Sequence, residues 1–339
     1  MGLSNVFFTA VNAVLPILLL ILLGYGLKRI GWIDSSFSKI GNKLVFNVFL
    51  PVMLFMSVYN IDSIASIQWD IVIYCSVILC LLFVVGYLIA VAGTKVPERK
   101  GVLMQCAFRS NYAIIGLPLA AALGGNEAMA VTSIISAFAI PFFNVFSVLS
   151  LSIFLKEKEQ KKRNFFKEII MNPMIIGVAL GLIALVIRQF ELQIFGEVVF
   201  SLKDDTKFVY TALDNVKSLT SPFALIVMGM QFEFSAVKGL FKEIVFGTVA
   251  RVVIAPLIGI GFAFILSTQF GILSCGASEY PALLALFGAP TAVSGAVMAI
   301  QMKNDEQLAT QLVVWTSVFS ILTIFLAVCI LMPAGLLSV

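Results

Sequence analysis

Long apolar segments alternate with short polar ones along the whole chain. A helix that crosses a membrane needs about 20 apolar residues to span about 30 Å of hydrocarbon. Applied to this pattern, that length predicts helices at residues 6–28, 43–60, 70–93, 100–124, 127–155, 169–188, 207–232, 241–267, 280–301 and 307–332. The chain is therefore expected to be an all-α, polytopic membrane protein with ten transmembrane helices.

The composition supports a membrane protein and argues against enzymatic chemistry. Of the 339 residues, 60% are hydrophobic and 12% are charged, and the mean hydropathy is +1.06. A soluble domain carries about 25% charged residues and needs polar side chains on the outer face of each element. The chain has no histidine, which removes the commonest general base and metal ligand. We therefore expect no enzymatic activity, no metal and no other cofactor.

Lysine and arginine are distributed unevenly between the loops. The loops after the first, third, fifth, seventh and ninth predicted spans hold sixteen of them, and the opposite loops hold three. Cytoplasmic loops are enriched in these residues, so both termini are expected outside the plasma membrane and the loop 156–168 is expected in the cytoplasm. The net charge of +4 therefore reflects membrane topology and does not indicate a nucleic-acid partner.

The charged loop divides the chain into two halves. Residues 1–155 hold the first five predicted spans, residues 156–168 form a cytoplasmic linker, and residues 169–339 hold the second five. An odd number of spans in each half means that a structural repeat between the halves would be inverted in the membrane. The sequence thus predicts two inverted five-helix repeats.

Interruptions at corresponding positions support such a repeat. Pro16 in the first span matches Pro173 in the sixth, and Pro51 in the second span matches Pro222 in the seventh. The fourth and ninth spans are each interrupted by glycine and proline, at Gly116, Pro118, Gly288 and Pro290. Proline is frequent in transmembrane helices, so a simple packing kink is the alternative interpretation, and for Pro118 it is the favoured one.

Polar residues lie at the middle of both interrupted spans. The fourth span presents Arg109, Ser110, Asn111 and Tyr112, and the ninth presents Gly288, Pro290 and Thr291 with Ser294 one turn further on. Unwound backbone at mid-membrane is tolerated only where protein or water covers it. The half-helix that follows each break also points its positive N-terminal end toward the centre. The sequence therefore predicts an anion site where the two breaks meet.

Arg109 is the strongest candidate for binding a ligand. A cation at mid-span costs about 2.5–3.5 kcal/mol or more unless it faces a cavity or a partner. Its planar guanidinium suits a carboxylate. A structural ion pair is the competing interpretation, but no acidic residue lies at mid-depth, and the nearest, Asp214, is one turn from Lys217.

Three further polar residues lie inside predicted spans. Asn47 and Asn144 either line the same cavity or form hydrogen bonds between helices. Arg251 lies ten residues from the cytoplasmic end of its span. It is expected to extend its side chain toward that end and to place its charge near water.

Three segments resemble the auxin efflux carrier family of bacterial and plant transporters. They are NYAIIGLPLAAALGG, NKLVFNVFLPVMLF and ALFGAPTAVSGAVMA, and the resemblance covers essentially the whole chain. Its most specific mark is Asn111 followed by Gly116-Leu117-Pro118. The resemblance implies that the fourth and ninth helices are broken and cross at the substrate site, between Ser110-Asn111 and Pro290-Thr291. It also implies transport of organic anions, such as auxin in plants and malate or malonate in bacteria.

The chain departs from the plant carriers in ways that favour a different substrate. Ser110 stands where those carriers have a proline, Arg109 is an added cation, and their long cytoplasmic domain is missing. An added cation suits a small dicarboxylate, so a bacterial malate-type organic-acid permease is expected. A sodium-coupled bile-acid-type symporter, and an organic-anion channel or sensor on the same fold, are the alternatives. The sequence leaves open whether H+ or Na+ is a coupling ion and whether the protein forms a homodimer.

Overall fold

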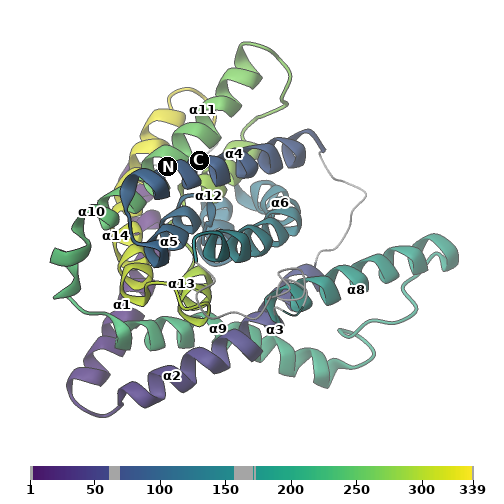
Figure 1. Ribbon diagram of the computed structural model, residues 1–339. Coiled ribbons are helices and arrows are strands. Elements are labelled where there is room, and N and C mark those ends of the chain that lie inside the picture. The colour runs from purple at the N-terminus through teal and green to yellow at the C-terminus, as the bar shows by residue number, and fades with distance from the viewer. Residues whose placement is uncertain (1–2, 61–68, 156–170, 172, 338–339) are drawn as a thin grey trace.

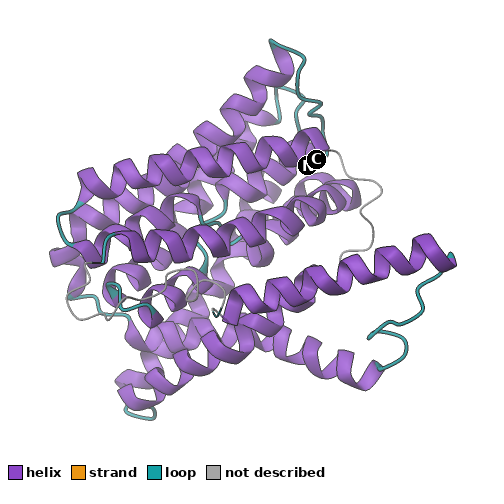
Figure 2. Cartoon of the chain, turned by 45° about the vertical axis from the view of Figure 1, so that its right-hand side comes forward, coloured by secondary structure: helices purple, strands orange, loops and turns teal. Residues whose placement is uncertain are grey.

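The computed structural model describes residues 3–60, 69–155, 171 and 173–337, and the expected linker 156–168 lies outside them. Apart from one isolated β-bridge, every regular element in these residues is a helix, as Figures 1 and 2 show. The helices are α1 (Leu3–Arg29), α2 (Ser35–Leu44), η1 (Val45–Phe49), α3 (Leu50–Tyr59), α4 (Trp69–Gly93), α5 (Pro97–Phe108), η2 (Tyr112–Gly116), α6 (Leu117–Ile153), α8 (Pro173–Phe195), α9 (Lys207–Gln231), α10 (Ala236–Val249), η3 (Ala250–Ile254), α11 (Ala255–Thr268), α12 (Glu279–Gly288), α13 (Val293–Gln301) and α14 (Glu306–Leu331). The prediction of an all-helical chain is confirmed for this part of the protein.

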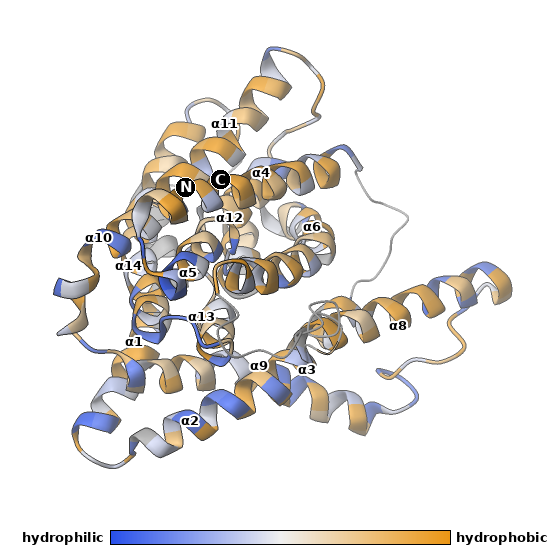
Figure 3. Cartoon of the chain, viewed as in Figure 1, coloured by the Kyte–Doolittle hydropathy of each residue, from blue (hydrophilic) through white to orange (hydrophobic). Residues whose placement is uncertain are grey.

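Helical elements occupy each range that the hydropathy pattern predicted, with shifted limits at several ends. Within the described residues, six helices are long and apolar enough to cross a membrane by length and composition. Large apolar side chains are exposed on their outer faces, for example Leu257 at 68% and Ile330 at 71%. Figure 3 shows that hydrophobic residues predominate along most of the helices. A multi-pass membrane protein needs this arrangement, because lipid surrounds it instead of water.

Proline explains the three π-helices in the described part of the chain. Each one ends two residues before a proline, at Pro51, Pro118 or Pro256. Proline has no N–H, and its ring collides with the carbonyl four residues earlier. The residue before the proline therefore donates to the carbonyl five residues back, as Leu50 does to Val45. The helix widens for one turn and continues.

A glycine pair separates the fourth and fifth predicted spans. Gly124 and Gly125 have non-helical backbone angles inside α6, and φ of Gly125 is +65°. Glycine reaches that left-handed conformation at little steric penalty. The helix is kinked there, and the segment Glu127–Ile153 is one of the six candidate spans.

The helices pack into two bundles. The first contains α1, α2, η1, α3, α8 and α9, and the second contains the remaining helices. In the first bundle α1 packs along α9, and a Cβ on Gly24 would lie 2.0 Å from the carbonyl oxygen of Ile226. Gly229 approaches the carbonyl of Ile21 equally closely, at 2.0 Å. Small residues at such contacts are typical of helices in lipid, where close packing replaces hydrophobic association.

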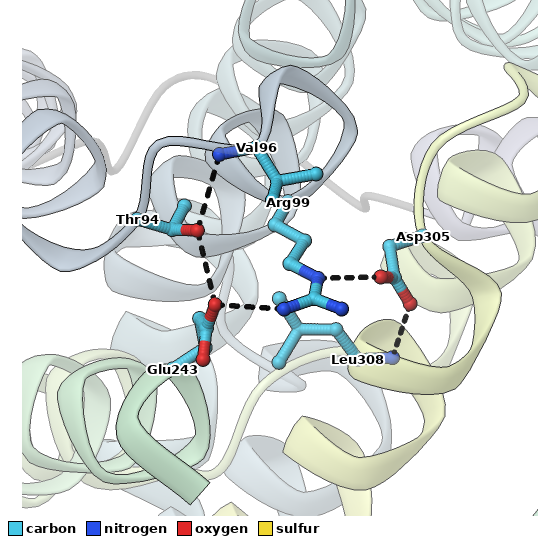
Figure 4. A network of polar contacts seen from close by, with 6 residues as sticks. All are labelled: Thr94, Val96, Arg99, Glu243, Asp305 and Leu308. Carbon is cyan, nitrogen blue, oxygen red and sulfur yellow. Dashed lines mark hydrogen bonds and ion pairs between the residues drawn. The ribbon is translucent and has the colours of Figure 1, made fainter. Parts of the chain in front are cut away.

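An ion-pair network connects three elements of the second bundle (Figure 4). The guanidinium of Arg99, in the first turn of α5, donates to Glu243 Oε1 on α10 at 3.0 Å and to Asp305 Oδ2 at 2.9 Å. Thr94 donates to the same Glu243 oxygen at 3.0 Å, and Asp305 accepts the N–H of Leu308 at 2.8 Å as the N-cap of α14. The network thus fixes the starts of α5 and α14 against α10.

Candidate functional site

Two helix breaks meet inside the second bundle. The chain leaves helical conformation between α5 and η2, at 109–111, and between α12 and α13, at 289–292. The N–H of Asn111 donates to the carbonyl of Pro290 at 2.8 Å, and the N–H of Ala292 donates to the carbonyl of Arg109 at 3.1 Å. Ser110 and Thr291 form an antiparallel bridge between these bonds. The two unwound segments therefore satisfy each other's backbone groups where no water would do so.

Threonine side chains complete this pairing. The hydroxyl of Thr291 donates to the carbonyl of Arg109 at 3.2 Å, and its N–H donates to Thr316 Oγ1 on α14 at 3.1 Å. Thr291 is thus held from both sides of the break. Its side chain supports the backbone of the site.

Helix ends of opposite polarity surround the breaks. The C-terminal ends of α5 and α12 lead into them, and η2 and α13 begin directly after them. A helix carries a partial positive charge at its N-terminal end and a partial negative charge at its C-terminal end. The site therefore has a positive side, formed where η2 and α13 begin, and a negative side, formed where α5 and α12 end.

Arg109 is buried on the positive side of the breaks, with 2% of its surface exposed. Its Nη1 donates to the carbonyl of Phe143 at 2.9 Å and to the hydroxyl of Ser147. Its Nη2 donates to Asn144 Oδ1 at 3.1 Å and to Ser294 Oγ at 3.0 Å. Each of these partners is neutral, and Nε has no partner among the described residues. The guanidinium is therefore solvated by protein dipoles and carries an unpaired positive charge.

A small cavity lies beside this guanidinium. Its volume is about 40 Å³, which is enough to hold a water molecule. It is lined by Met53, Leu54, Arg109, Ser110, Asn111, Tyr112, Ile140, Phe143, Asn144, Ala292 and Ser294. Because Met53 and Leu54 belong to α3, the cavity lies between the two bundles.

Two polar atoms of residues that line this cavity lack partners. Among the described residues, Arg109 Nε and Ser110 Oγ are buried and form no hydrogen bond with protein. A buried polar group without a partner is destabilising by about 1–3 kcal/mol. These atoms are therefore available to a ligand that reaches the cavity.

Most of the residues that the sequence indicated come together here. Arg109, Ser110, Asn111, Tyr112, Asn144 and Ser294 all line the cavity. Pro290 and Thr291 lie behind it and pair with the other break. Asn47 lies elsewhere: it is exposed on η1, and its amide donates to the carbonyl of Lys43 at 2.8 Å. This bond lies within one helical segment, so the described structure shows Asn47 neither lining this cavity nor joining two helices.

Two expectations need correction. Gly116 and Pro118, counted as a helix break in the sequence, lie in continuous helix, because the chain passes there directly from η2 into α6; for Pro118 this agrees with the packing kink that was the favoured interpretation. Gly288 does end α12, as expected. Arg251 does not extend toward water: it is 0% exposed, and its guanidinium donates to main-chain carbonyls in the bundle. These carbonyls lie beside the guanidinium and accept its N–H groups, so the side chain does not extend to the water at the membrane surface.

Sequence reasoning missed two residues of the site. Ser147 accepts from Arg109, and its signal was its position three residues after Asn144, on the same helix face. Gly295 leaves space for the arginine stem, since a Cβ there would lie 3.0 Å from Arg109 Cδ. No sequence signal distinguished Gly295 from other glycines in apolar segments.

These features define a multi-pass membrane transport protein, with apolar helices around a buried polar site. Residues 9–328 match the family described as membrane transport protein, and the chain belongs to that family. This confirms the resemblance to the auxin efflux carriers, and it identifies a transporter and not an enzyme.

Two archaeal relatives align over almost the whole chain. An uncharacterized transporter of Methanocaldococcus jannaschii is 26% identical over 321 residues, which cover 93% of this chain and 96% of that protein. An uncharacterized transporter of Methanothermobacter thermautotrophicus is 23% identical over 322 residues, which cover 94% of this chain and 97% of that protein.

Proposed function

We propose that this protein is a secondary transporter of small, malate-like dicarboxylates in the plasma membrane. The observation that carries the proposal is the environment of Arg109, whose charge is buried with four neutral hydrogen-bond partners. Neutral dipoles reduce the desolvation penalty of a buried cation but leave its net charge in place. A substrate carboxylate would supply the missing anion and would exchange hydrogen bonds with Ser147, Asn144 or Ser294.

The second carboxylate would lie near the helix ends that begin at the breaks. Ser294 is in the first turn of α13, and Asn111 immediately precedes η2. The N-terminal ends of these helices attract anions. Ser110 Oγ has no protein partner among the described residues and would donate to one of the remaining oxygens. This second positive region is the reason for preferring a dicarboxylate to a monocarboxylate.

Symmetric packing supports the proposal of two inverted five-helix repeats, residues 1–155 and 169–339. Exchanging the halves relates α1 to α8 and α3 to α9. The pair α1–α9 then becomes the pair α8–α3, and both pairs pack extensively. The two paired breaks would likewise exchange with each other. In this arrangement ten helices cross the membrane, both termini lie outside, and the linker 156–168 is cytoplasmic.

Transport would proceed by alternating access, with the two bundles moving relative to each other. The cavity lies at the junction of the bundles, and a volume of about 40 Å³ is too small for a dicarboxylate. Substrate entry therefore requires the α3 side to separate from the paired breaks. The ion pairs of Arg99 would keep the second bundle intact during that movement.

Purified protein in proteoliposomes tests this proposal. We expect saturable uptake of labelled malate that is stimulated by dicarboxylate on the opposite side, and a raised melting temperature with malate, because a ligand that binds only the folded state stabilises it. Arg109→Ala should remove both effects, whereas Asn47→Ala, on an exposed residue away from the cavity, should retain them. Malate binding that survives Arg109→Ala would refute the role of Arg109. Uptake without counter-substrate stimulation would indicate a channel.

A further inference from the structure

Arg251 lies on the negative side of the paired breaks, opposite the cavity. It belongs to η3 and is 0% exposed. Its Nε donates to the carbonyl of Ala289 at 2.8 Å, and its Nη2 donates to the carbonyls of Leu286 and Phe287, both at 2.9 Å. Its Nη1 donates to the carbonyl of Ala107 at 3.3 Å. All four acceptors are main-chain oxygens at the C-terminal ends of α12 and α5.

Those carbonyls form a site suited to a cation. The last four carbonyls of a helix have no partner within the helix. Each helix C-terminus carries about half a negative elementary charge, so two such ends together offer about one. A single guanidinium matches that charge, and the guanidinium of Arg251 donates to four of the carbonyl oxygens. In transporters with broken helices, half-helix C-termini and unwound carbonyls coordinate the coupling Na+ or H+.

We propose that Arg251 is a resident cation of this site, and that it takes the place of a coupling sodium ion so that transport does not require sodium. The inference rests on the proposed anion transport at Arg109, but the occupied cation site is defined by the contacts of Arg251 alone. Arg251 is absent from the lining of the cavity. It acts as a positioning residue: it binds carbonyls at the ends of α5 and α12 and thereby holds these two helices together.

The wider turn of η3 contributes to this arrangement. Arg251 is the second residue of that π-helix, which Pro256 imposes. With Arg251 in place, the negative ends of α5 and α12 are neutralised. The field that a substrate anion meets at Arg109 then comes from the positive helix ends and from Arg109 itself. Arg251 would thereby favour anion binding on the other side of the break.

The experiment uses the full-length protein and compares sodium chloride with choline chloride at equal ionic strength. For the wild type we expect the same melting temperature and the same malate uptake in both salts. Arg251→Gln should retain a folded, monodisperse protein but lower uptake about tenfold or more. Millimolar guanidinium or sodium should then raise the melting temperature and the uptake of this variant, because the vacated carbonyls accept a free cation.

Two further variants separate the role of the charge from general packing. Arg251→Lys keeps the charge with fewer directed donors, so it should retain more uptake than Arg251→Gln and should not respond to sodium. Arg29→Gln, an exposed arginine at the end of α1, should behave like the wild type. If Arg251→Gln fails to fold, the salt comparison on the wild type and on Arg251→Lys still decides the question.

The outcomes also separate this inference from the proposed function. Sodium-dependent melting or uptake of the wild type, or wild-type uptake by Arg251→Gln, would overturn the inference. Absence of malate uptake in the wild type would refute the substrate proposal instead. The salt dependence of melting would still test Arg251.

Discussion

The N–H of Asn111 donates to the carbonyl of Pro290 at 2.8 Å, which joins two helix breaks that are far apart in the sequence. With the bond from Ala292 to Arg109, at 3.1 Å, it makes the two breaks one structural unit. Arg109 lies on one side of that unit and Arg251 on the other, and neither has an acidic hydrogen-bond partner in the described structure. The organisation of the site therefore depends on cations that face opposite helix ends.

An aspartate beside Arg109 should imitate a bound substrate. Asn144→Asp would place a carboxylate oxygen where Asn144 Oδ1 now accepts from Nη2 at 3.1 Å. The internal ion pair should neutralise the guanidinium and raise the melting temperature. It should also weaken malate binding about tenfold or more, as expected when an opposite charge already compensates the site. Melting curves with and without malate measure both effects.

The exposed Asn47 supplies the control for that variant. Asn47→Asp should leave malate binding unchanged, because this residue is away from the cavity. Unchanged malate binding by Asn144→Asp would contradict the proposed pairing of substrate and Arg109.

Close contact of α1 with α9 should make Gly24 intolerant of any side chain. A Cβ at Gly24 would lie 2.0 Å from the carbonyl oxygen of Ile226, so the helices would have to separate. Gly24→Ala should destabilise the protein by about 1–3 kcal/mol or more, or prevent folding. Gly26→Ala is the matched control in the same helix, because nothing lies within 4 Å of its Cβ position. The yield of monodisperse protein and its melting temperature compare the two, and equal values would contradict the contact.

Removal of the Arg99 guanidinium should loosen the second bundle. Arg99→Gln leaves the carboxylates of Glu243 and Asp305 without their shared cation, and their side chains are only 10% and 20% exposed. We expect a loss of about 1–2 kcal/mol of unfolding free energy, between the values for surface and buried ion pairs.

A double-mutant cycle isolates the Arg99 interaction. Arg99→Gln combined with Glu243→Gln should lose less stability than the sum of the single changes, because the interaction is removed only once. Lys95→Gln, on an exposed neighbouring residue, should have little effect. Additive losses in the cycle would show that Arg99 and Glu243 do not interact.

The proposed orientation predicts which loops a membrane-impermeant thiol reagent reaches. In a variant without the natural cysteines, Lys203→Cys should be labelled from outside intact cells, since it belongs to the loop with few basic residues. Lys158→Cys, in the linker 156–168, should be labelled only after the membrane is opened. The reverse pattern would invert the proposed topology and would leave the fold unaffected.

The sequence located much of the site because the membrane has a known thickness, so the position of a residue within a spanning helix gives its depth. Counting residues from the ends of apolar segments placed Arg109, Ser110 and Asn111 at mid-depth, and these residues line the cavity. The same counting misplaced Arg251, because it considered only the distance to water. The carbonyl ends of α5 and α12 lie closer and compete for the guanidinium.

The sequence by itself determined where helices form, where two of them are interrupted, and which polar residues lie at those interruptions. Apolar length, proline chemistry and helix rise are local properties that any segment of chain carries with it. Only the tertiary structure decided that Ser147 and Ser294 contact Arg109, that Gly24 meets Ile226, and that Arg251 joins two half-helices. These contacts connect residues on separate helices, so they depend on how the bundles pack, which hydropathy along one chain does not specify.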